Sequence, residues 1–320
     1  MRQPRDEAFP VPPAVGAALD GTARPVLAVS GGLDSMVLLH AVAECHPPGA
    51  TPIVATFDHG TGPVATRAVA LVTGTALQAG FECVTGTAAS PGISEEEWRR
   101  ARWQFLREVA ARSCGTIVTA HTLDDQVETI FMRILREAGP RGLAGLYAES
   151  DVVRPFVNIS RETLEAYAVA RGVEFVIDPT NSSRRYLRNR VRHDLLPSIA
   201  KIRPRFSRDL IAISRRSAEW RRALDSLLES VDASEGADGS LSVARSSLAG
   251  YDAESLCVLW PALAARAHVV MDRRGTHRAA EFTMKGATGG SIQLSGRFEI
   301  VMHRDHMLLR RWGRAERTLA

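Results

Sequence analysis

Six residues near the N-terminus, Ser30 to Ser35, have the composition of an anion-binding loop, Ser-Gly-Gly-Leu-Asp-Ser. Two adjacent glycines remove the Cβ atoms that would keep the backbone away from a ligand, and the serines add hydroxyl donors. Asp34 would repel a phosphate unless a divalent metal lay between them, so the loop predicts Mg²⁺ and a nucleotide. The lysine with which a Walker A loop reaches the phosphates is missing.

A second candidate site begins at His121, in the sequence His-Thr-Leu-Asp-Asp-Gln-Val-Glu-Thr. Asp125 and Glu128 are three residues apart, so they share one face of a helix near its N-terminus. Their carboxylates could bind a metal ion or a cationic substrate. The residues also fit a structural interpretation, because Thr122 with Asp125 matches a capping box and acids in a first turn stabilise a helix. The segment alone leaves both interpretations open.

A third candidate is the basic segment from Ser183 to His193, which holds five arginines between Arg184 and Arg192 and no acidic residue. Guanidinium groups are suited to RNA phosphates, and Tyr186 could stack on a base. The alternative is a solvated helix face whose arginines pair with nearby acids.

Strand and helix patterns alternate around the first two candidates. Apolar β-type runs predict strands at residues 26–29, 53–57, 81–85 and 116–120, with helices at 36–44, 66–78 and 94–112 between them. This order predicts an α/β fold, a parallel sheet with helices on both faces. Ligands of such sheets bind at the carboxyl ends of strands, and three segments follow strands there: the loop at Ser30, the turn Asp58-His59-Gly60 and the His121 segment.

The rest of the chain predicts further elements and a second domain. A strand, a helix and a strand are expected at 152–153, 161–170 and 174–177, a helix at 204–229 and a small β unit at 291–309. Residues 1–23 are expected to be an irregular lead-in, 24–215 the nucleotide-binding catalytic domain and 216–320 a smaller C-terminal domain. The polar loop from Asp232 to Ser240 is the expected inter-domain break.

Length and composition agree with this division. A chain of 320 residues exceeds the size that one core usually supports, and the formal net charge of +4 permits nucleic-acid binding without requiring it. The four cysteines form no C-x-x-C pair, which argues against a zinc ribbon, an iron–sulfur site or a redox dithiol. No apolar run reaches membrane-spanning length and the N-terminus lacks a signal-peptide core, so a cytoplasmic protein is expected.

The loop at Ser30 resembles the PP-loop of the ATP pyrophosphatases, which split ATP between its α- and β-phosphates and transfer AMP to an oxygen of the substrate. The segment at His121 is similar to the H-x-x-D-D-x-x-E-T motif of the tRNA(Ile)-lysidine synthases in that superfamily. Six other segments fit the same family: 58–60, 101–106, 142–146, 154–156, 178–181 and 188–193. The chain departs from the family pattern at Thr122, where a second histidine is usual, and at Thr61-Gly62-Pro63.

This resemblance implies a ligase that uses ATP and Mg²⁺, with roles for particular residues. The implied catalytic residues are Asp34, Asp125 and Glu128, and the implied metal ligands are Asp34 and Asp125. The implied ATP-binding residues are Ser30, Gly31, Gly32, Leu33, Asp34, Ser35, Asp58 and His59. The implied substrate-binding residues are Arg102, His121, Arg188, Arg190 and Arg192.

The implied reaction joins free lysine to C2 of the wobble cytidine in an isoleucine tRNA with a CAU anticodon, through an adenylated tRNA. Two alternatives remain open. One is a PP-loop tRNA thiolase, which would need a C-x-x-C platform or a persulfide-carrying cysteine; the other is a non-catalytic nucleotide- or RNA-binding protein. The expected partners are the tRNA and lysine, and no association with a membrane is expected. The sequence leaves the oligomeric state open, with a homodimer as one alternative.

Overall fold

The computed structural model describes residues 9–45, 49–60, 62–88, 95–177, 183–184 and 186–312, without the side chains of residues 95 and 96. The chain divides into two compact units, one formed by residues 1–136 and 145–212 and the other by residues 137–144 and 213–320. The division falls within one long helix, α9 (Phe206–Leu227), close to the boundary predicted at residue 216.

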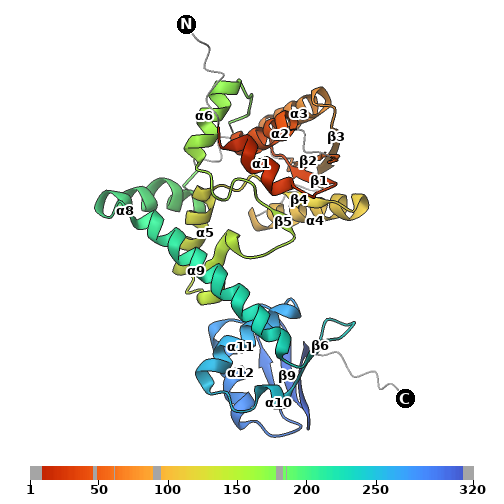
Figure 1. Ribbon diagram of the computed structural model, residues 1–320, viewed down its shortest axis with the longest axis vertical. Coiled ribbons are helices and arrows are strands. Elements are labelled where there is room, and N and C mark those ends of the chain that lie inside the picture. The colour runs from red at the N-terminus through yellow and green to blue at the C-terminus, as the bar shows by residue number, and fades with distance from the viewer. Residues whose placement is uncertain are drawn as a thin grey trace. The chain divides into compact units, whose positions relative to one another are not determined.

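The first unit contains a five-stranded sheet of order β3-β2-β1-β4-β5, in which every neighbouring pair is parallel (Figure 1). Its strands are β1 (Pro25–Ala28), β2 (Ile53–Asp58), β3 (Glu82–Thr87), β4 (Thr116–Val118) and β5 (Val152–Val153). The predicted parallel α/β sheet is therefore confirmed. The helices of this layered part are α1 (Val11–Leu19), α2 (Leu33–Cys45), α3 (Pro63–Gln78), α4 (Glu95–Ser113), α5 (Leu123–Leu135) and α6 (Arg161–Arg171).

Alternating side chains of the strands pack against helices on opposite faces of the sheet. Leu27, Val54 and Val118 are buried in one core with α1, α2, α3 and α6. Their neighbours Val26 and Ile117 are buried in a second core with α4. Because successive side chains of a strand point to opposite faces, this division shows that both faces are covered.

The strand order sets where a ligand can bind. From β1 the chain proceeds to β2 and β3 on one side, and then crosses over to β4 and β5 on the other. The direction of winding therefore reverses between β1 and β4, and ligands of such sheets bind at the carboxyl ends of the strands beside this reversal, a place that we call the β1–β4 crevice. The loop at Ser30 leaves β1 and the His121 segment leaves β4, so the topology brings together two of the three predicted sites.

The remaining elements of the first unit pack against α5. They are α7 (Leu187–Arg190), the π-helix η4 (Val191–Leu195), α8 (Leu196–Ile202) and the first residues of α9. Val127, Ile130 and Phe131 of α5 form a core with Val191 and Leu210. This core holds the basic segment beside the first turns of α5.

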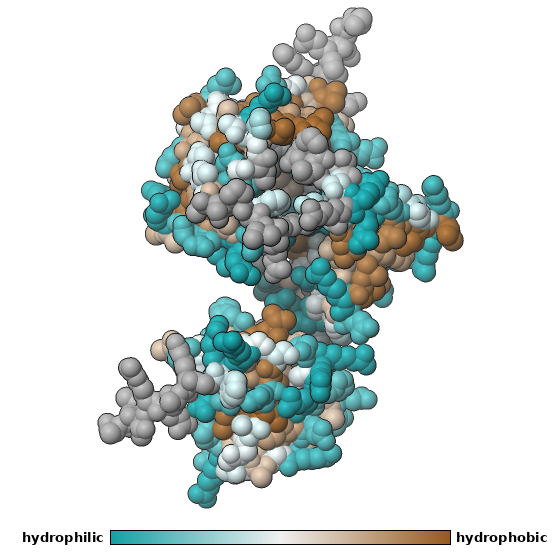
Figure 2. All heavy atoms as spheres, turned by 180° about the vertical axis from the view of Figure 1, so that it is seen from behind, coloured by the Kyte–Doolittle hydropathy of each residue, from teal (hydrophilic) through white to brown (hydrophobic). Residues whose placement is uncertain are grey.

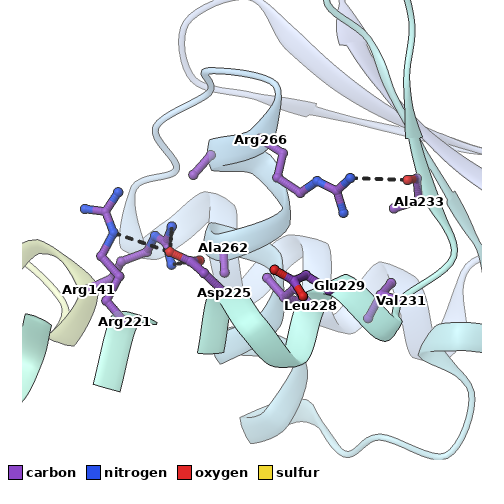
Figure 3. Close-up of a pocket in the computed structure, with 10 residues that line it drawn as sticks. Arg141, Arg221, Asp225, Leu228, Glu229, Val231, Ala233, Ala262 and Arg266 are labelled. Atoms are coloured by element: carbon purple, nitrogen blue, oxygen red, sulfur yellow. Dashed lines mark hydrogen bonds and ion pairs between the residues drawn. The ribbon is translucent and has the colours of Figure 1, made fainter. Parts of the chain in front are cut away.

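The second unit has an antiparallel sheet of order β6-β7-β10-β9-β8 with its own core, in which Trp260 is fully buried. Its elements include β6 (Ala233–Glu235), β7 (Leu241–Ala244), β8 (Ser291–Leu294), β9 (Phe298–Met302), β10 (His306–Arg311), η5 (Leu228–Ser230), α10 (Arg245–Leu248), α11 (Ala253–Arg266) and α12 (Arg273–Lys285). Residues 137–144 join this unit through a bidentate ion pair, in which Arg141 donates to Asp225 at 2.7 and 3.2 Å (Figure 3). The pair lines a cavity of about 530 Å³.

Three predicted features differ from the structure. Residues 11–19 of the predicted irregular lead-in form α1, whose buried Val11, Val15 and Leu19 recur at helical spacing. The prolines do not prevent this helix, because they stand at its start, where no backbone hydrogen bond is lost. Residues 232–240 contribute to the β6–β7 pair rather than to an inter-domain break. Residues 174–177 are not a strand; instead Val176 donates its N–H to the carbonyl of Gly31 at 2.9 Å.

The visible surface is largely hydrophilic. Figure 2 shows hydrophobic side chains gathered over α8 and the end of η4, where Ile202 and Leu195 are exposed. In the part of the chain that the structure describes, no helix is both long and apolar enough to cross a membrane.

Candidate functional site

Two serines close the loop that follows β1. Ser35 accepts a hydrogen bond from the N–H of Ser30 at 3.1 Å and donates to the carbonyl of Gly32 at 2.9 Å. The two hydroxyl oxygens lie 3.2 Å apart. These hydrogen bonds fix the shape of the loop, which leads directly into the first turn of α2, where backbone N–H groups and the helix dipole favour an anion.

Gly31 is the position where this loop needs a glycine. Its φ is +84°, and a Cβ atom added there would lie 2.8 Å from the Cβ of Ala68, which is buried on α3. The carbonyl of Gly31 is fixed by the N–H of Val176. Positive φ and close approach of a helix both exclude a side chain, so the loop fits tightly between α3 and the segment after α6.

Gly31→Ala is expected to destabilise the protein by about 2–4 kcal/mol, from left-handed backbone strain and displacement of α3, and to weaken ATP binding. Gly74→Ala is a matched control because Gly74 lies within α3 with open space around its Cβ position. That change should stabilise by about 0.5–1 kcal/mol, since alanine favours a helix over glycine. Chemical denaturation and nucleotide titration measure both; equal stability of the two variants would contradict the assigned role of Gly31.

Asp34 carries an unsatisfied buried oxygen at the start of α2. Its Oδ2 accepts a hydrogen bond from Arg161 at 3.2 Å, whereas its buried Oδ1 has no hydrogen-bond partner among the described residues. Burial raises the pKa of Asp34 from 3.8 to about 6, opposed by the charge of Arg161 and assisted by that of Asp125. A buried carboxylate oxygen without a donor fits a cation, so the residues present are compatible with Mg²⁺.

The structural interpretation of the His121 segment is confirmed at its first turn. Thr122 caps α5, and its Oγ1 accepts a hydrogen bond from the N–H of Asp125 at 3.2 Å. In return, Asp125 Oδ2 accepts hydrogen bonds from the Thr122 N–H at 2.8 Å and from the Thr122 hydroxyl at 3.0 Å. Thr122, at the position where the resembling family has a histidine, thus has a defined role. The cap uses only one oxygen of Asp125, so the second remains for another partner.

That second oxygen belongs to a cluster of four charged side chains, which we call the carboxylate–guanidinium cluster: Asp125, Glu128, Arg188 and Arg192. Asp125 Oδ1 accepts from Arg188 at 2.8 Å and from Arg192 at 3.2 Å. Glu128 accepts from Arg188 Nε at 2.8 Å, from Arg192 Nε at 2.5 Å and from Arg192 Nη2 at 3.1 Å. Every oxygen of the two carboxylates therefore has at least one donor.

The cluster is well shielded from water. The Glu128 side chain is 2% exposed, Asp125 is 13% exposed, and each arginine is 28% exposed. Burial alone would raise the pKa of Asp125, but the Arg188 charge and the Thr122 N–H hold it below its ordinary value. Asp125 is thus held ionised by a neighbour that lies about sixty residues away in sequence.

This geometry revises two predictions about the charged residues. The basic segment lacks acids in its own sequence, yet Arg188 and Arg192 pair with acids from α5, and Arg184 pairs with Asp194 at 3.0 Å. Arg190 lies between the two paired arginines in sequence and is exposed. Phosphate binding thus remains a prediction, for which Arg190 is the exposed one among Arg188, Arg190 and Arg192. Mg²⁺ binding by Asp125 would require a present donor to leave.

His121 lies beside the cluster in a partly buried position. Its Nδ1 is 2.7 Å from the hydroxyl of Thr119. Burial lowers the pKa of His121 from 6.5 to about 4, and the charges of Arg188, Arg154 and Arg102 lower it further against the opposing charge of Asp125. His121 is therefore neutral near pH 7, and Arg102 of α4 lies within electrostatic range of it.

Asp58 and His59 occupy the end of β2, next to β1 in the sheet. Asp58 accepts a hydrogen bond from the N–H of Gly60 at 2.8 Å, which shapes the turn. The His59 ring lies 5.0 Å from the ring of Phe57 and 6.2 Å from that of Trp98. Trp98 Nε1 is buried without a hydrogen-bond partner among the described residues. These rings form an aromatic wall on the side of β1 away from β4.

The structure adds three residues to the candidate site. Arg161 contacts Asp34 through its guanidinium, and its backbone N–H donates to Asp124 at 2.7 Å, so it links the two loops. Arg154 follows β5 and its buried Nε has no partner among the described residues. Gln126, fully buried, accepts from the N–H of Leu146 at 2.6 Å. Arg154 lies in the segment 154–156 that resembles the family, although no role was predicted for it, whereas nothing local marks Arg161.

Apart from Arg102 of α4, the predicted residues fall into three groups. The β1 loop, Asp34, Asp125, Glu128, His121, Arg188 and Arg192 converge at the β1–β4 crevice. Asp58 and His59 lie at the end of β2, on the other side of β1, and Arg190 faces solvent. Residues 178–181, which contributed to the family resemblance, lie outside the described residues, as does Thr61. Among the described residues, no group of three or more His, Cys, Asp or Glu side chains is placed to hold a metal alone.

Comparison with known proteins identifies the family. A PP-loop domain model matches residues 14–199. The chain is 34% identical over 252 residues to the tRNA(Ile)-lysidine synthase of Methylobacterium sp. (strain 4-46), covering 75% of this chain and 73% of that protein. It is 37% identical over 206 residues to the tRNA(Ile)-lysidine synthase of Solibacter usitatus, covering 63% of this chain and 46% of that protein. The chain thus spans about half the length of some curated relatives.

A solved structure supports the fold. The U34-tRNA thiolase of Methanococcus maripaludis aligns with a TM-score of 0.52 at 15% sequence identity, covering 70% of this chain and 80% of that one. Together with the domain match and the sequence identities, the parallel sheet and its β1 loop lead to one assignment. The chain belongs to the tRNA(Ile)-lysidine synthase family of PP-loop proteins.

Proposed function

We propose that this protein joins free lysine to C2 of the wobble cytidine of an isoleucine tRNA with a CAU anticodon, using ATP and releasing AMP and pyrophosphate. The proposal rests on two features that meet at one crevice in a chain of this family. One is a PP-loop with a buried carboxylate oxygen that has no partner among the described residues, and the other is a pair of shielded carboxylates. The first is suited to a metal-bound nucleotide and the second to an amine.

The loop from Ser30 to Ser35 binds the pyrophosphate end of ATP in this proposal. Its rigid backbone and the first turn of α2 provide N–H donors, and Asp34 Oδ1 is the group that would hold Mg²⁺. One or two carboxylates together with phosphate oxygens are the usual magnesium ligands in nucleotide sites. When bound, Mg²⁺ would neutralise negative charge on the phosphates as pyrophosphate departs.

The aromatic wall of His59 and Trp98 is suited to the adenine ring. It lies at the end of β2, on the other side of the loop from the cluster. A nucleotide that runs from this wall across the loop would present its α-phosphate toward the β1–β4 crevice. The aromatic rings provide stacking area, and the indole N–H of Trp98 provides a buried donor for a ring nitrogen.

The chemistry proceeds in two steps that balance in atoms and charge. The C2 oxygen of cytidine attacks the α-phosphorus of ATP, a P–O bond forms, and the bond to pyrophosphate breaks. The lysine ε-nitrogen then attacks C2, and the C2–O bond breaks with AMP as leaving group. The amine loses a proton, and a carboxylate or water beside it must accept that proton. In this proposal, Asp125 and Glu128 orient the amine.

One assay tests this function directly. Purified protein is incubated with ATP, Mg²⁺, labelled lysine and an isoleucine tRNA transcript with the CAU anticodon, and lysine incorporation is measured. Incorporation is expected with this transcript and not with a transcript whose wobble cytidine is replaced. Absence of incorporation under conditions where ATP and RNA bind would refute the proposal, and pyrophosphate release without lysine transfer would favour a thiolase. Light scattering of the RNA complex would distinguish one protomer from a homodimer.

A further inference from the structure

Helices α2 and α6 pack against each other in the first unit and are joined by an ion pair near each end. At their starts, Asp34 of α2 accepts a hydrogen bond from Arg161 of α6 at 3.2 Å. At their ends, Glu44 of α2 lies 2.9 Å from the guanidinium of Arg171 of α6. On each helix the two charged residues are ten positions apart, which is about 15 Å of helix. The two helices therefore run in the same direction with matching ends.

Two of these four charges stand at the unfavourable end of their own helix. Arg161 is the first residue of α6, where the positive end of the helix dipole disfavours a cation. Glu44 stands in the last turn of α2, where the negative end of the dipole disfavours a carboxylate. Both gain a partner of opposite charge on the neighbouring helix. The two ion pairs thus favour one placement of α6 along α2.

Tyr167 of α6 strengthens the contact at the far end. Its side chain is fully buried, its hydroxyl donates to Glu44 Oε2 at 2.5 Å, and His40 Nδ1 lies 2.8 Å from the same hydroxyl. Burial raises the pKa of Tyr167 and the hydrogen bond to Glu44 raises it further, so the hydroxyl is a donor at neutral pH. A buried hydrogen bond to a charged acceptor is short and directional, so it limits sliding of α6 along α2.

The placement of α6 decides whether Arg161 reaches the PP-loop. The reach depends on where α6 begins relative to α2, whichever anion the guanidinium contacts there. Asp124 fixes one point of α6, because it accepts the backbone N–H of Arg161 at 2.7 Å. A helix held at one point can still pivot about it. A second contact near the other end, at Tyr167, fixes the direction of the helix axis.

We propose that Tyr167, through Glu44, is a positioning residue for ATP binding, because it fixes the far end of α6 on α2 and so holds the Arg161 guanidinium at the PP-loop. The inference rests on the ATP-binding part of the proposed function. It goes beyond that function by assigning a role to a buried hydroxyl that lies about 9 Å further along α6 than Arg161. Tyr167 acts here through Arg161 and not by touching the nucleotide.

A double-mutant cycle tests this coupling. ATP with Mg²⁺ is titrated calorimetrically, without RNA or lysine, into Tyr167→Phe, Arg161→Gln and the variant that carries both changes. Arg161→Gln is expected to weaken ATP binding by about tenfold, the value of one charge-assisted hydrogen bond. Tyr167→Phe alone should weaken it by about three- to fivefold, but by less than about 1.5-fold when Arg161 is already replaced. A merely structural role of Tyr167 would give the same loss in both backgrounds.

Two further variants keep the test independent of folding. Tyr167→Phe retains the buried ring, so it should fold with a Tm lower by about 2–6 °C. Glu44→Gln removes the acceptor charge at a side chain that is 33% exposed, and it should show the same dependence on Arg161. Tyr147→Phe is the matched control, because the exposed Tyr147 hydroxyl donates to Asn158 at 2.9 Å in the same unit. That change should leave ATP affinity within about 1.5-fold.

The possible outcomes separate this inference from the proposed function. Unchanged ATP affinity in both Tyr167→Phe and Glu44→Gln would overturn the inference, as would losses that simply add to that of Arg161→Gln. Unchanged affinity in Arg161→Gln would also overturn it, since there would be nothing to position. None of these titrations depends on lysine transfer. Coupled losses of ATP affinity in a protein that incorporates no lysine would therefore retain the inference and refute the ligase.

Discussion

Replacing Asp34 with asparagine is expected to reduce ATP-dependent pyrophosphate release by about 10³-fold, equivalent to about 4 kcal/mol of transition-state stabilisation. The reason is the loss of the one buried carboxylate oxygen in the loop that has no partner among the described residues. Without that charge, the metal that would neutralise the departing pyrophosphate is held poorly. Pyrophosphate release in the presence of the CAU transcript measures the effect.

The same change is expected to stabilise the ligand-free protein at neutral pH. The pKa of Asp34 is about 6 in the folded protein against an ordinary 3.8. Between these values the folded state binds more protons than the unfolded state, so the contribution of Asp34 to stability falls as pH rises through this window. An uncharged asparagine side chain at this position would remove the resulting penalty, worth at most about 3 kcal/mol at pH 7 to 8. Denaturation at pH 4 and pH 8 measures the difference.

A matched control is Asp20→Asn, which removes one carboxylate from an exposed position in the same unit. It should not change pyrophosphate release by a measurable amount. RNA retention should remain near that of the unmodified protein in both variants. If Asp34→Asn lowered RNA retention and stability together with pyrophosphate release, Asp34 would be a structural residue and the assignment to ATP would be wrong.

The second large effect is expected for Asp125→Asn, which should lower lysine transfer by about 100-fold while pyrophosphate release persists. Asparagine keeps one carbonyl oxygen to accept the Thr122 N–H, so the cap should be largely retained. The amide no longer neutralises Arg188 and Arg192, so a loss of stability of roughly 1–3 kcal/mol is expected, and thermal unfolding verifies that the variant is folded. The negative charge facing the amine is lost. Adenylated tRNA should therefore accumulate and be visible by mass spectrometry of the RNA.

Asp124→Asn provides the control for this experiment. Asp124 is exposed on the same first turn of α5 and accepts the backbone N–H of Arg161. Asp124→Asn removes the same charge at the position next to Asp125, yet lysine transfer should remain within about threefold of the unmodified protein. Loss of pyrophosphate release in Asp125→Asn would instead place Asp125 in the ATP-dependent step, as the prediction that it binds Mg²⁺ would require.

The elements that the sequence predicted correctly are those with strong local signals. The strand β1, the glycine loop and helix α2 are consecutive, so their arrangement depends on backbone preferences and on the hydrophobic pattern of neighbouring residues. Thr122 and Asp125 likewise form their cap within one turn. The segment at 174–177 has an apolar pattern of the same kind, but its backbone hydrogen bonds to Gly31 instead of joining the sheet. Whether a segment becomes a strand depends on whether its backbone lies beside the edge of another strand, and the local residue pattern does not reveal this.

The sequence by itself determined the loop chemistry of Ser30 to Ser35 and the parallel α/β sheet, and it predicted that three strand-end segments meet. These follow from residue type, periodicity and the rule that ligands bind at strand ends. The strand order of the structure selected the two segments that follow β1 and β4. Only the tertiary structure decided the partners of the charges: Arg161 for Asp34, and Arg188 and Arg192 for Asp125 and Glu128. Electrostatic pairing depends on distance and burial in space, and helices α5 and α7 meet through a hydrophobic core that is formed by residues far apart in the chain.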